Sequence, residues 1–278
     1  MQLLVGDTIY FSASDGSTGH ELWAHNTSNG TTWQVADINS VSGSSNPGEY
    51  MQLLVGDTLY FSAVDGSTGH ELWAHDTSNH STWQVADLYS GSSSSSPGRF
   101  MQLLVGDTIY FSALDGSTGV ELWAHDTSNH STWQVAELIV GLNYNGPLSS
   151  FPGEFMQLLV GDTIYFSAND GSTGQELWAH DTSNHSTWEV AEINTWIMMG
   201  GAGLGSNPGE YMAVPVGDTL YFSAVAGSGG HELWAHDTSN HSTWQVADLN
   251  SGSFGSFPGQ YMEICLLYTS PSPRDRVR

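Results

Sequence analysis

The sequence predicts an all-β protein, namely a β-propeller of four-stranded blades. Two observations carry this prediction. The first is an internal repeat of about 50 residues, the size of one propeller blade, with five complete copies and the start of a sixth. The second is that each copy holds four short segments rich in β-branched and aromatic residues, separated by glycine-containing turns and without helical periodicity. A parallel β-helix is the main rival, but its coils are much shorter, and a tandem sandwich array would need more strands per copy.

Five methionines mark the starts of the copies. Because units two and three match at 34 of their first 38 positions, we infer recent duplication, and identity between units is weak evidence for selection on any one residue. The expected units are residues 1–50, 51–100, 101–155, 156–211 and 212–261, with residues 262–264 beginning a sixth.

Unit two shows the expected elements in order. Residues 51–55 form the first strand, and Gly56-Asp57 is a turn typical of hairpins. Residues 58–63 form the second strand, and the glycine-rich segment 65–69 breaks it. The third strand spans 70–75, the next turn 76–81, and the fourth strand 82–88. A Gly/Ser loop then leads to the next unit. In a propeller, Trp73 and Trp83 point sideways into the contacts between blades.

The charge distribution excludes several classes of function. The chain has 29 acidic residues, 4 basic residues and a net charge of −25. Arg99 is the only base before residue 265, so the surface cannot neutralise nucleic-acid phosphates. No apolar run reaches the roughly 20 residues of a spanning helix, so we expect no membrane insertion. The only cysteine, Cys265, lies beyond the repeats, which leaves no disulfide or thiolate site within them.

The last residues break the pattern. Residues 265–275 read Cys-Leu-Leu-Tyr-Thr-Ser-Pro-Ser-Pro-Arg-Asp, and nothing similar occurs earlier. They resemble the translation of a transposase-type sequencing adapter. We therefore treat residues 265–278 as a non-native tail and leave them out of the fold prediction.

One stretch of each unit carries a family resemblance. Residues 71–77 of unit two read Glu-Leu-Trp-Ala-His-Asp-Thr, and residues 85–88 read Val-Ala-Asp-Leu. This pattern, present in all five units, resembles the ELWxxDGT repeat family, which is found mostly in large secreted or surface bacterial proteins. The resemblance implies an extracellular or cell-surface location. The chain departs from the family where Thr77 and its copies replace glycine, and where Asn26 replaces the aspartate.

Metal sites are weakly supported. His70 and His75 are five residues apart, so on a strand they point to opposite faces and cannot form a zinc-protease pair. We expect the histidines to be partly exposed and to titrate near their ordinary pKa. The glycine-rich turns offer oxygen ligands that calcium could use, although they lack the carboxylate density of a known calcium loop. The calcium candidates are Asp15, Asp65, Asp115 and Asp170; otherwise we expect no cofactor.

The units differ mainly in the loop after the fourth strand. In a propeller these loops share one face, and loops held on a rigid fold are where binding usually resides. The inserted residues are apolar and aromatic on a Ser/Gly background, so they either form a recognition patch or plug the channel mouth. The predicted ligand-binding residues are Trp196, Tyr144, Tyr89 and Phe254, with the first two as main anchors.

Three functions remain open. The leading hypothesis is a non-catalytic, secreted or cell-surface scaffold that binds an extracellular protein or glycan through the variable loops. The alternative is a polysaccharide-active enzyme, with Glu154, Glu189 and Glu210 as the asymmetric acids. The third is a purely structural spacer within a repeat protein.

Two further expectations concern the ring. Gln52 and its copies on the first strand are expected to line the central channel as hydrated side chains. Since Met262 begins another first strand, a truncated larger ring explains the repeats better than a closed ring of five. A truncated ring would expose a blade face.

Overall fold

The protein is all-β in the computed structural model. The model describes residues 1–40, 43–143, 146–196, 203–227, 229–252 and 254–260. Within those ranges every regular element is a strand, so no helix there could cross a membrane. The prediction of an all-β fold built from four-stranded blades is confirmed.

Each unit forms one antiparallel sheet whose strands are in sequence order. The bounds in unit two deviate from the predicted ones by at most two residues, chiefly at strand ends. In unit one the strands are β1 Gln2–Val5, β2 Thr8–Ser14, β3 His20–Asn26 and β4 Thr32–Ala36; in unit two β5 Gln52–Val55, β6 Thr58–Ala63, β7 Glu71–Asp76 and β8 Ser81–Ala86; in unit three β9 Gln102–Val105, β10 Thr108–Leu114, β11 Val120–Asp126 and β12 Ser131–Ala136; in unit four β15 Gln157–Val160, β16 Thr163–Asn169, β17 Gln175–Asp181 and β18 Ser186–Ala191; and in unit five β19 Ala213–Val216, β20 Thr219–Val225, β21 His231–Asp237 and β22 Ser242–Ala247.

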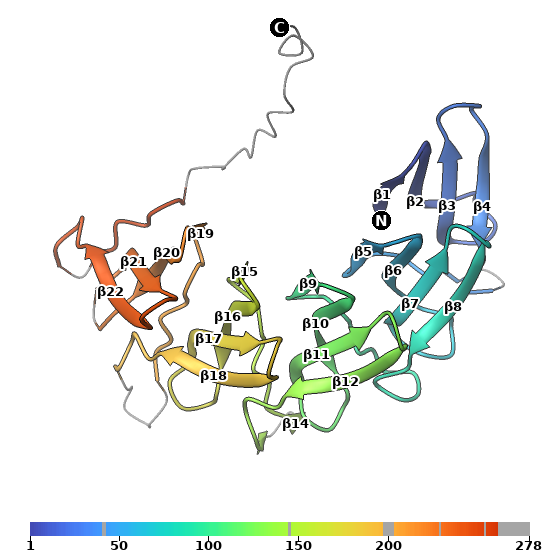
Figure 1. Cartoon of the computed structure of the whole chain (residues 1–278). Helices are drawn as coiled ribbons and strands as arrows, with labels where there is room; N and C mark the ends of the chain where they lie inside the picture. The colour runs from blue at the N-terminus through green and yellow to red at the C-terminus, as the bar shows by residue number, and fades with distance from the viewer. Residues whose placement is uncertain (41–42, 144–145, 197–202, 228, 253, 261–278) are drawn as a thin grey trace, which may run out of the picture.

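The five sheets stand side by side in an open arc (Figure 1). The first strands β1, β5, β9, β15 and β19 lie on the inner side of the arc, and the fourth strands lie on its outer rim. Units one and five form the two ends of the arc. The arrangement is that of adjacent propeller blades.

The register of each sheet gives it two different faces. In unit two, Gln52, Phe61, Trp73 and Gln84 lie opposite one another across the four strands, so their side chains share one face. The next residues along, among them Tyr60 and Trp83, point to the other face. We call the first the leading face, because it meets the preceding unit, and the second the trailing face, because it meets the following unit.

The hydrophobic core lies between the sheets. Between units two and three, Tyr60 and Leu72 of one trailing face pack against Ile109 and Phe111 of the next leading face. Equivalent clusters join units one and two, three and four, and four and five. The tryptophans of the third and fourth strands pack against these clusters, so they point into the contacts between blades as predicted. Each sheet therefore depends on its neighbour for burial.

The glutamines of the first strands make contacts between blades that the sequence did not indicate. The Gln52 side chain accepts a hydrogen bond from the Gln2 backbone amide at 2.8 Å, and Gln102 and Gln157 repeat this bond in the next units. These glutamines therefore tie the first strands of neighbouring blades together, because a blade edge leaves an amide that needs an acceptor.

One sequence-based expectation is wrong, and it concerns the third-strand histidines. His75, His125, His180 and His236 are fully or almost fully buried rather than partly exposed. Burial, followed by repulsion from the nearby histidine of the next turn, lowers the pKa of each to about 4. The His125 ring lies 5.4 Å from the Tyr60 ring of the preceding unit, and its Nδ1 lies 2.8 Å from the Thr132 hydroxyl. These histidines are therefore neutral core residues.

Candidate functional site

One face of the arc carries both the variable loops and the glycine-rich turns. In an antiparallel sheet the turn after the second strand lies at the same end as the terminus of the fourth strand. The structure follows this rule: the Gly69 amide donates to the Ser93 carbonyl at 3.1 Å, which joins the turn of unit two to its own variable loop. This loop-bearing face is where sequence reasoning expects a ligand site.

A buried glutamate clamps each variable loop at both ends. In unit two, Glu71 accepts hydrogen bonds from the Leu88 amide, the Ser95 amide and the Ser95 hydroxyl at 2.8, 2.9 and 2.6 Å. The other units repeat these three bonds with Glu21, Glu121, Glu176 and Glu232. Because the clamp fixes both ends, the residues between them can vary without disturbing the sheet.

The clamped serine lies 24 residues after its glutamate in units one, two and five, but 29 and 30 residues after it in units three and four. The two insertions therefore rise from a constant base. In unit three the insertion forms a small hairpin of β13 Leu142–Asn143 and β14 Gly146–Pro147.

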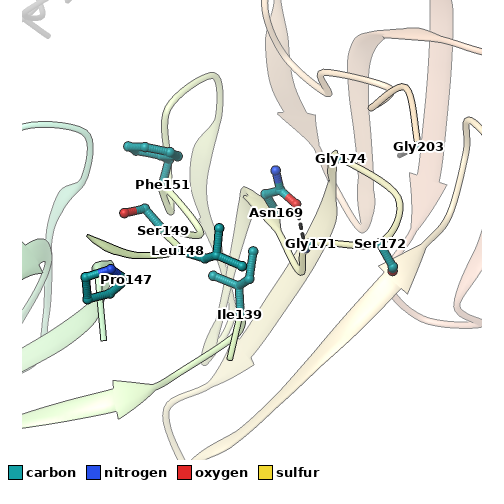
Figure 2. Close-up of a pocket in the computed structure, with 10 residues that line it drawn as sticks. All are labelled: Ile139, Pro147, Leu148, Ser149, Phe151, Asn169, Gly171, Ser172, Gly174 and Gly203. Atoms are coloured by element: carbon teal, nitrogen blue, oxygen red, sulfur yellow. Dashed lines mark hydrogen bonds between the residues drawn. The ribbon is translucent and has the colours of Figure 1, made fainter. Parts of the chain in front are cut away.

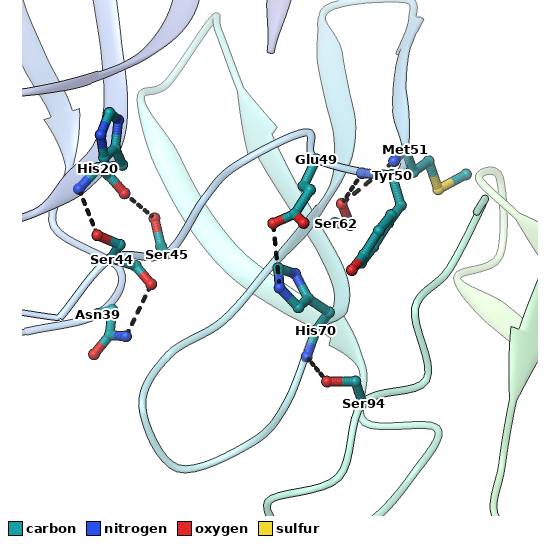
Figure 3. A network of polar contacts seen from close by, with 10 residues as sticks. All are labelled: His20, Asn39, Ser44, Ser45, Glu49, Tyr50, Met51, Ser62, His70 and Ser94. Atoms are coloured by element: carbon teal, nitrogen blue, oxygen red, sulfur yellow. Dashed lines mark hydrogen bonds and ion pairs between the residues drawn. The ribbon is translucent and has the colours of Figure 1, made fainter.

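The chain leading into each new blade is fixed by a short polar network (Figure 3). The Ser62 hydroxyl accepts hydrogen bonds from the Tyr50 and Met51 amides at 2.9 and 3.3 Å. Beside it, the Glu49 carboxylate lies 3.5 Å from His70 Nε2. Burial lowers the pKa of His70, and the Glu49 charge opposes that shift.

The residue at the position of Glu49 varies between units together with the residue that it contacts, at the position of His70. Glu210 pairs with His231 at 3.1 Å in unit five, and Glu154 accepts a hydrogen bond from Gln175 at 3.0 Å in unit four. Where unit three has Val120 as the partner, the acid is replaced by Arg99. The Arg99 guanidinium lies over the Tyr50 and Phe100 rings instead, 5.7 and 5.6 Å from their centroids. Unit three therefore presents a different surface from its neighbours.

A cavity of about 450 Å³ lies between the insertion of unit three and the turn of unit four (Figure 2). Ile139, Pro147, Leu148 and Phe151 form its apolar wall. The opposite wall is polar backbone and small side chains, from Asn169, Gly171, Ser172, Gly174 and Gly203. None of these lining residues is charged. The cavity is thus suited to an apolar group flanked by hydrogen-bonding groups.

The cavity walls are held in place by specific contacts. Ile139 is buried and packs onto Gly171, where an added Cβ would come within 2.6 Å of it. The Asn169 side chain accepts a hydrogen bond from the Gly171 amide at 2.6 Å. The Gly203 amide donates to the Ser172 carbonyl at 3.0 Å. Contacts within the chain therefore hold both walls of this cavity, which we call the groove.

Phe151 stands between this cavity and a second one of about 200 Å³, which Arg99, Phe100 and Val120 help to line. The Phe151 ring packs edge-on against Phe100 with centroids 5.3 Å apart. Its backbone has φ of 48°, a conformation that bulky residues rarely adopt. The same turn has a positive φ in every unit, including Phe257 with φ of 49° in unit five, so this conformation belongs to the repeat. What distinguishes Phe151 is its place between the two cavities.

The predicted ligand-binding residues lie in different units and differ in exposure to solvent. Trp196 is 55% exposed, and its carbonyl accepts a hydrogen bond from the Leu204 amide at 3.0 Å, next to Gly203 of the groove. Phe254 is 76% exposed on unit five. Tyr89 is partly buried and packs on Gly116 of the next unit, in the position that Ile139 takes on Gly171. Tyr144 lies outside the described residues. Ligand binding by these four remains a prediction.

Ile139, Leu148 and Phe151 form the groove, yet the sequence reasoning did not select them as anchors. The sequence signal for Phe151 is partial, because the same pre-proline position holds Asn46, Ser96 and Asn207 in three units but Phe257 in unit five. Asparagine and serine suit a turn, so units three and five stand apart by carrying a bulky residue there.

The four calcium candidates use their carboxylates to stabilise turns. Asp15 accepts hydrogen bonds from the Ser17 and Thr18 amides at 2.8 and 3.0 Å and from the Ser17 hydroxyl at 2.8 Å. These bonds lower the pKa of Asp15 to about 2. Asp65, Asp115 and Asp170 make the same contacts. Across the described ranges no three His, Cys, Asp or Glu side chains converge as metal ligands. Calcium binding at these turns remains a prediction.

Two of the three acids considered for catalysis have separate partners, whereas Glu189 Oε1 is buried without a hydrogen-bond partner among the described residues. Glu154 binds Gln175, and Glu210 pairs with His231 and accepts a hydrogen bond from the Asn207 amide group at 3.1 Å. Glu189 lies on β18, where burial, and then the charges of Asp170 and Glu192, raise its pKa. Burial, opposed by the Gln175 hydrogen bond, also raises the pKa of Glu154.

Comparison with solved structures identifies the fold. Dipeptidyl peptidase 4 of Porphyromonas gingivalis matches with a TM-score of 0.55 and 11% identity, over 88% of this chain and 38% of that one. A puromycin hydrolase matches with a TM-score of 0.51 and 12% identity, over 89% of this chain and 37% of that one. TolB of Acinetobacter baumannii matches with a TM-score of 0.41 and 11% identity, over 85% and 50%.

The puromycin hydrolase and the dipeptidyl peptidase, which have the higher TM-scores, contain β-propellers. The chain has a β-propeller fold. This chain covers less than two fifths of the length of either peptidase chain. No protein-family model matches the sequence, and a search of curated proteins found no match. The resemblance to ELWxxDGT repeats therefore remains a prediction.

The comparisons overturn one expectation. The symmetry of the repeated positions predicted that this chain is not an enzyme, because a catalytic constellation should break that symmetry. Yet propellers of this architecture occur within a puromycin hydrolase and a dipeptidyl peptidase. The propeller fold is therefore compatible with enzymes, and a symmetric set of blades is no evidence against a catalytic protein.

Proposed function

We propose that this propeller is a recognition module that binds an apolar segment of an extracellular protein in the groove between units three and four. The observation that carries the proposal is the groove itself. It is lined on one side by Ile139, Pro147, Leu148 and Phe151, and on the other by Asn169 and glycine backbone. An apolar side chain fits the first wall, and the peptide groups flanking it fit the polar second wall.

The surroundings of the groove support a protein partner. Val140 and Leu142 of the same insertion are exposed, as is Trp196 beside Gly203. Exposed apolar side chains around an apolar pocket are typical of protein–protein contacts. Because the chain carries a net charge of −25, basic residues flanking the apolar segment would speed association.

The proposed location is extracellular or at the cell surface. The support is the composition, which is rich in Ser, Thr, Gly and Asn and poor in basic residues, together with the ELWxxDGT resemblance. A dense negative surface also keeps an exposed module soluble and apart from anionic lipids.

Selection from a displayed peptide library on the immobilised protein tests the proposal. We expect enriched peptides with an apolar core and flanking Lys or Arg. Leu148→Asp and Phe151→Ser should each weaken their binding at least about 30-fold, the effect of losing a hot-spot contact. Val216→Ser, at an exposed apolar position on β19 outside this groove, is the matched control and should bind normally.

Enriched peptides that bind the Leu148→Asp variant unchanged would contradict the groove as the site. Retention of a neutral glycan on a glycan array, lost in the same variants, would instead assign the groove to the second partner class. Circular dichroism and a thermal melt of each variant establish that the fold is kept.

A further inference from the structure

The two ends of the arc carry complementary halves of an interface that the chain already makes four times. The leading face of unit one presents Ile9, Phe11 and Trp23, and the trailing face of unit five presents Tyr221, Leu233 and Trp244. The equivalent residues of the inner units are the ones packed together in the four core clusters.

Exposure shows that both end faces lack a cover among the described residues. Ile9 is 38% exposed, whereas its equivalents Leu59, Ile109 and Ile164 are fully buried. At the other end, Trp244 is 39% exposed, and Val246 and Leu249 beside it are also exposed. Apolar surface of this kind is stabilised by burial against a matching face.

The polar and aromatic contacts also come in unmatched halves. In each inner interface a tyrosine ring lies over the histidine of the following unit, as Tyr10 does over His75 at 5.6 Å and Tyr165 over His236 at 5.6 Å. In the register of the repeat, Tyr221 is the tyrosine with no following histidine, and His25 is the histidine with no preceding tyrosine.

The first strands and the turns show the same relation. The Gln52 side chain binds the Gln2 amide, and by the same register the Gln2 side chain corresponds to an acceptor for the Ala213 amide. Gly66, Gly116 and Gly171 are each contacted by a loop residue of the preceding unit, whereas an added Cβ at Gly16 meets nothing within 4 Å. Asn250 of unit five occupies the loop position that would fill that space.

We propose that a second copy of this chain docks head to tail, with the trailing face of its unit five on the leading face of unit one. Four pairs of the same surfaces already fit together within each molecule, so the two end faces are complementary in shape, register and hydrogen bonding. The contact is heterologous, because each copy uses two different surfaces, and it can extend to further copies.

The experiment compares two full-length variants, each blocked at one end, by sedimentation velocity over a concentration series. Phe11→Asp blocks the leading face of unit one, and Trp244→Asp blocks the trailing face of unit five. We expect the unmodified chain to form dimers and larger species as its concentration rises. Each variant alone should be a monomer, with association weakened at least about 30-fold.

The decisive sample is an equal mixture of the two variants. Each still carries one intact face, and these faces are complementary, so the mixture should form a heterodimer and nothing larger. Trp196→Asp, in the unit-four loop, is the control and should self-associate normally, which also separates this test from the peptide-binding test.

Three outcomes would overturn the proposal: an unmodified chain that stays monomeric up to its solubility limit, a homodimer in either blocked variant, or no heterodimer in the mixture. Circular dichroism checks that both variants are folded. If either is not, the milder pair Ile9→Ser and Leu249→Ser, both at exposed positions, replaces them in the same design.

Discussion

The inner units and the end units of the arc contain nearly the same residues in different surroundings. Glu121 in unit three and Glu232 in unit five make the same three hydrogen bonds to their loops. Burial raises the pKa of Glu121 to about 7 despite those bonds. For Glu232 burial also raises the pKa, but by less than the bonds from Ser256, Leu249 and Asn250 together lower it, and the pKa falls below its ordinary value.

This difference indicates that the neighbouring blade, rather than the local sequence, determines the pKa of the clamp glutamate in each repeat. Both carboxylates are buried, Glu121 fully and Glu232 with 5% exposure. Unit three is also covered by unit four, whereas unit five has no following unit within the described residues. The additional protein around Glu121 disfavours its charged form, which is the expected effect of desolvation. The following predictions test this comparison.

The largest expected difference is in packing. Ile109→Ala removes a fully buried side chain between two sheets and should cost about 2–5 kcal/mol, because the cavity cannot collapse. Ile9→Ala makes the same change at the open end and should cost less than about 1 kcal/mol. Urea unfolding in dilute protein, where the end faces are free, measures both. Equal costs would show that Ile9 is covered in the monomer.

The next effect is the pH dependence of the glutamate clamp. Because the folded pKa of Glu121 is raised to about 7, its contribution to stability is present at pH 5 and is lost as the pH rises through 7. Glu121→Gln should therefore destabilise the protein by about 2 kcal/mol more at pH 5 than at pH 8.

Glu232→Gln is the matched control for that variant. The folded pKa of Glu232 is lowered, so its contribution is lost only as the pH falls below its ordinary value. Its cost should be the same at pH 5 and pH 8. Unfolding curves of both variants at the two pH values give the comparison, and a pH-independent cost for Glu121→Gln would contradict the raised pKa.

The buried histidines predict loss of stability in acid. Their folded pKa is lowered to about 4, so between the ordinary value of 6.5 and that value the unfolded chain binds protons that the folded chain does not. Each histidine should therefore lower the stability as the pH falls through this window. Five glutamates act in the opposite direction because burial raises their pKa values, namely Glu71, Glu121, Glu154, Glu176 and Glu189, so the histidine effect is measured by removing one histidine.

His125→Asn tests this assignment, because asparagine retains a hydrogen bond to Thr132 and has no charge to gain. The loss of stability between pH 7 and pH 5 should shrink by about 1–2 kcal/mol in this variant. Thermal melts across that range measure it. An unchanged loss would place the acid sensitivity elsewhere.

The smallest effect concerns the turn before the fourth strand. His80 has φ of 63°, a left-handed conformation, and unit one has Gly30 with φ of 73° in the same place. His80→Gly should raise stability by up to about 1 kcal/mol, because glycine adopts this conformation without steric cost. The reverse change, Gly30→His, should lower it by a similar amount. A midpoint shift of the same sign in both variants would rule out this explanation.

Much of the fold could be predicted from the sequence because its cause is local. The repeat period, the Gly-Asp turn, the glycine-rich turn and the alternation around Tyr60 and Phe61 depend on residues close together in the chain. The position of the candidate site on the variable loops could also be predicted, since the strand order decides which loops share a face.

The residues of that site could not all be predicted. Ile139 and Tyr89 occupy equivalent loop positions, and both pack on a glycine of the next blade, yet only Ile139 lines the large groove. The difference arises because the longer unit-three insertion and Phe151 add further walls beside Ile139. These residues come together only in the folded chain.

The sequence by itself determined the repeat, the four strands of each blade, the acidic charge and the face that carries the loops. The tertiary structure alone decided that the histidines are buried and that Gln52 accepts a hydrogen bond from the neighbouring blade. It also decided that the pKa of Glu121 is raised while that of Glu232 is lowered. The physical reason is that burial and hydrogen bonding between blades depend on what lies next to each repeat, and nearly identical repeats at the middle and the end of an arc have different neighbours.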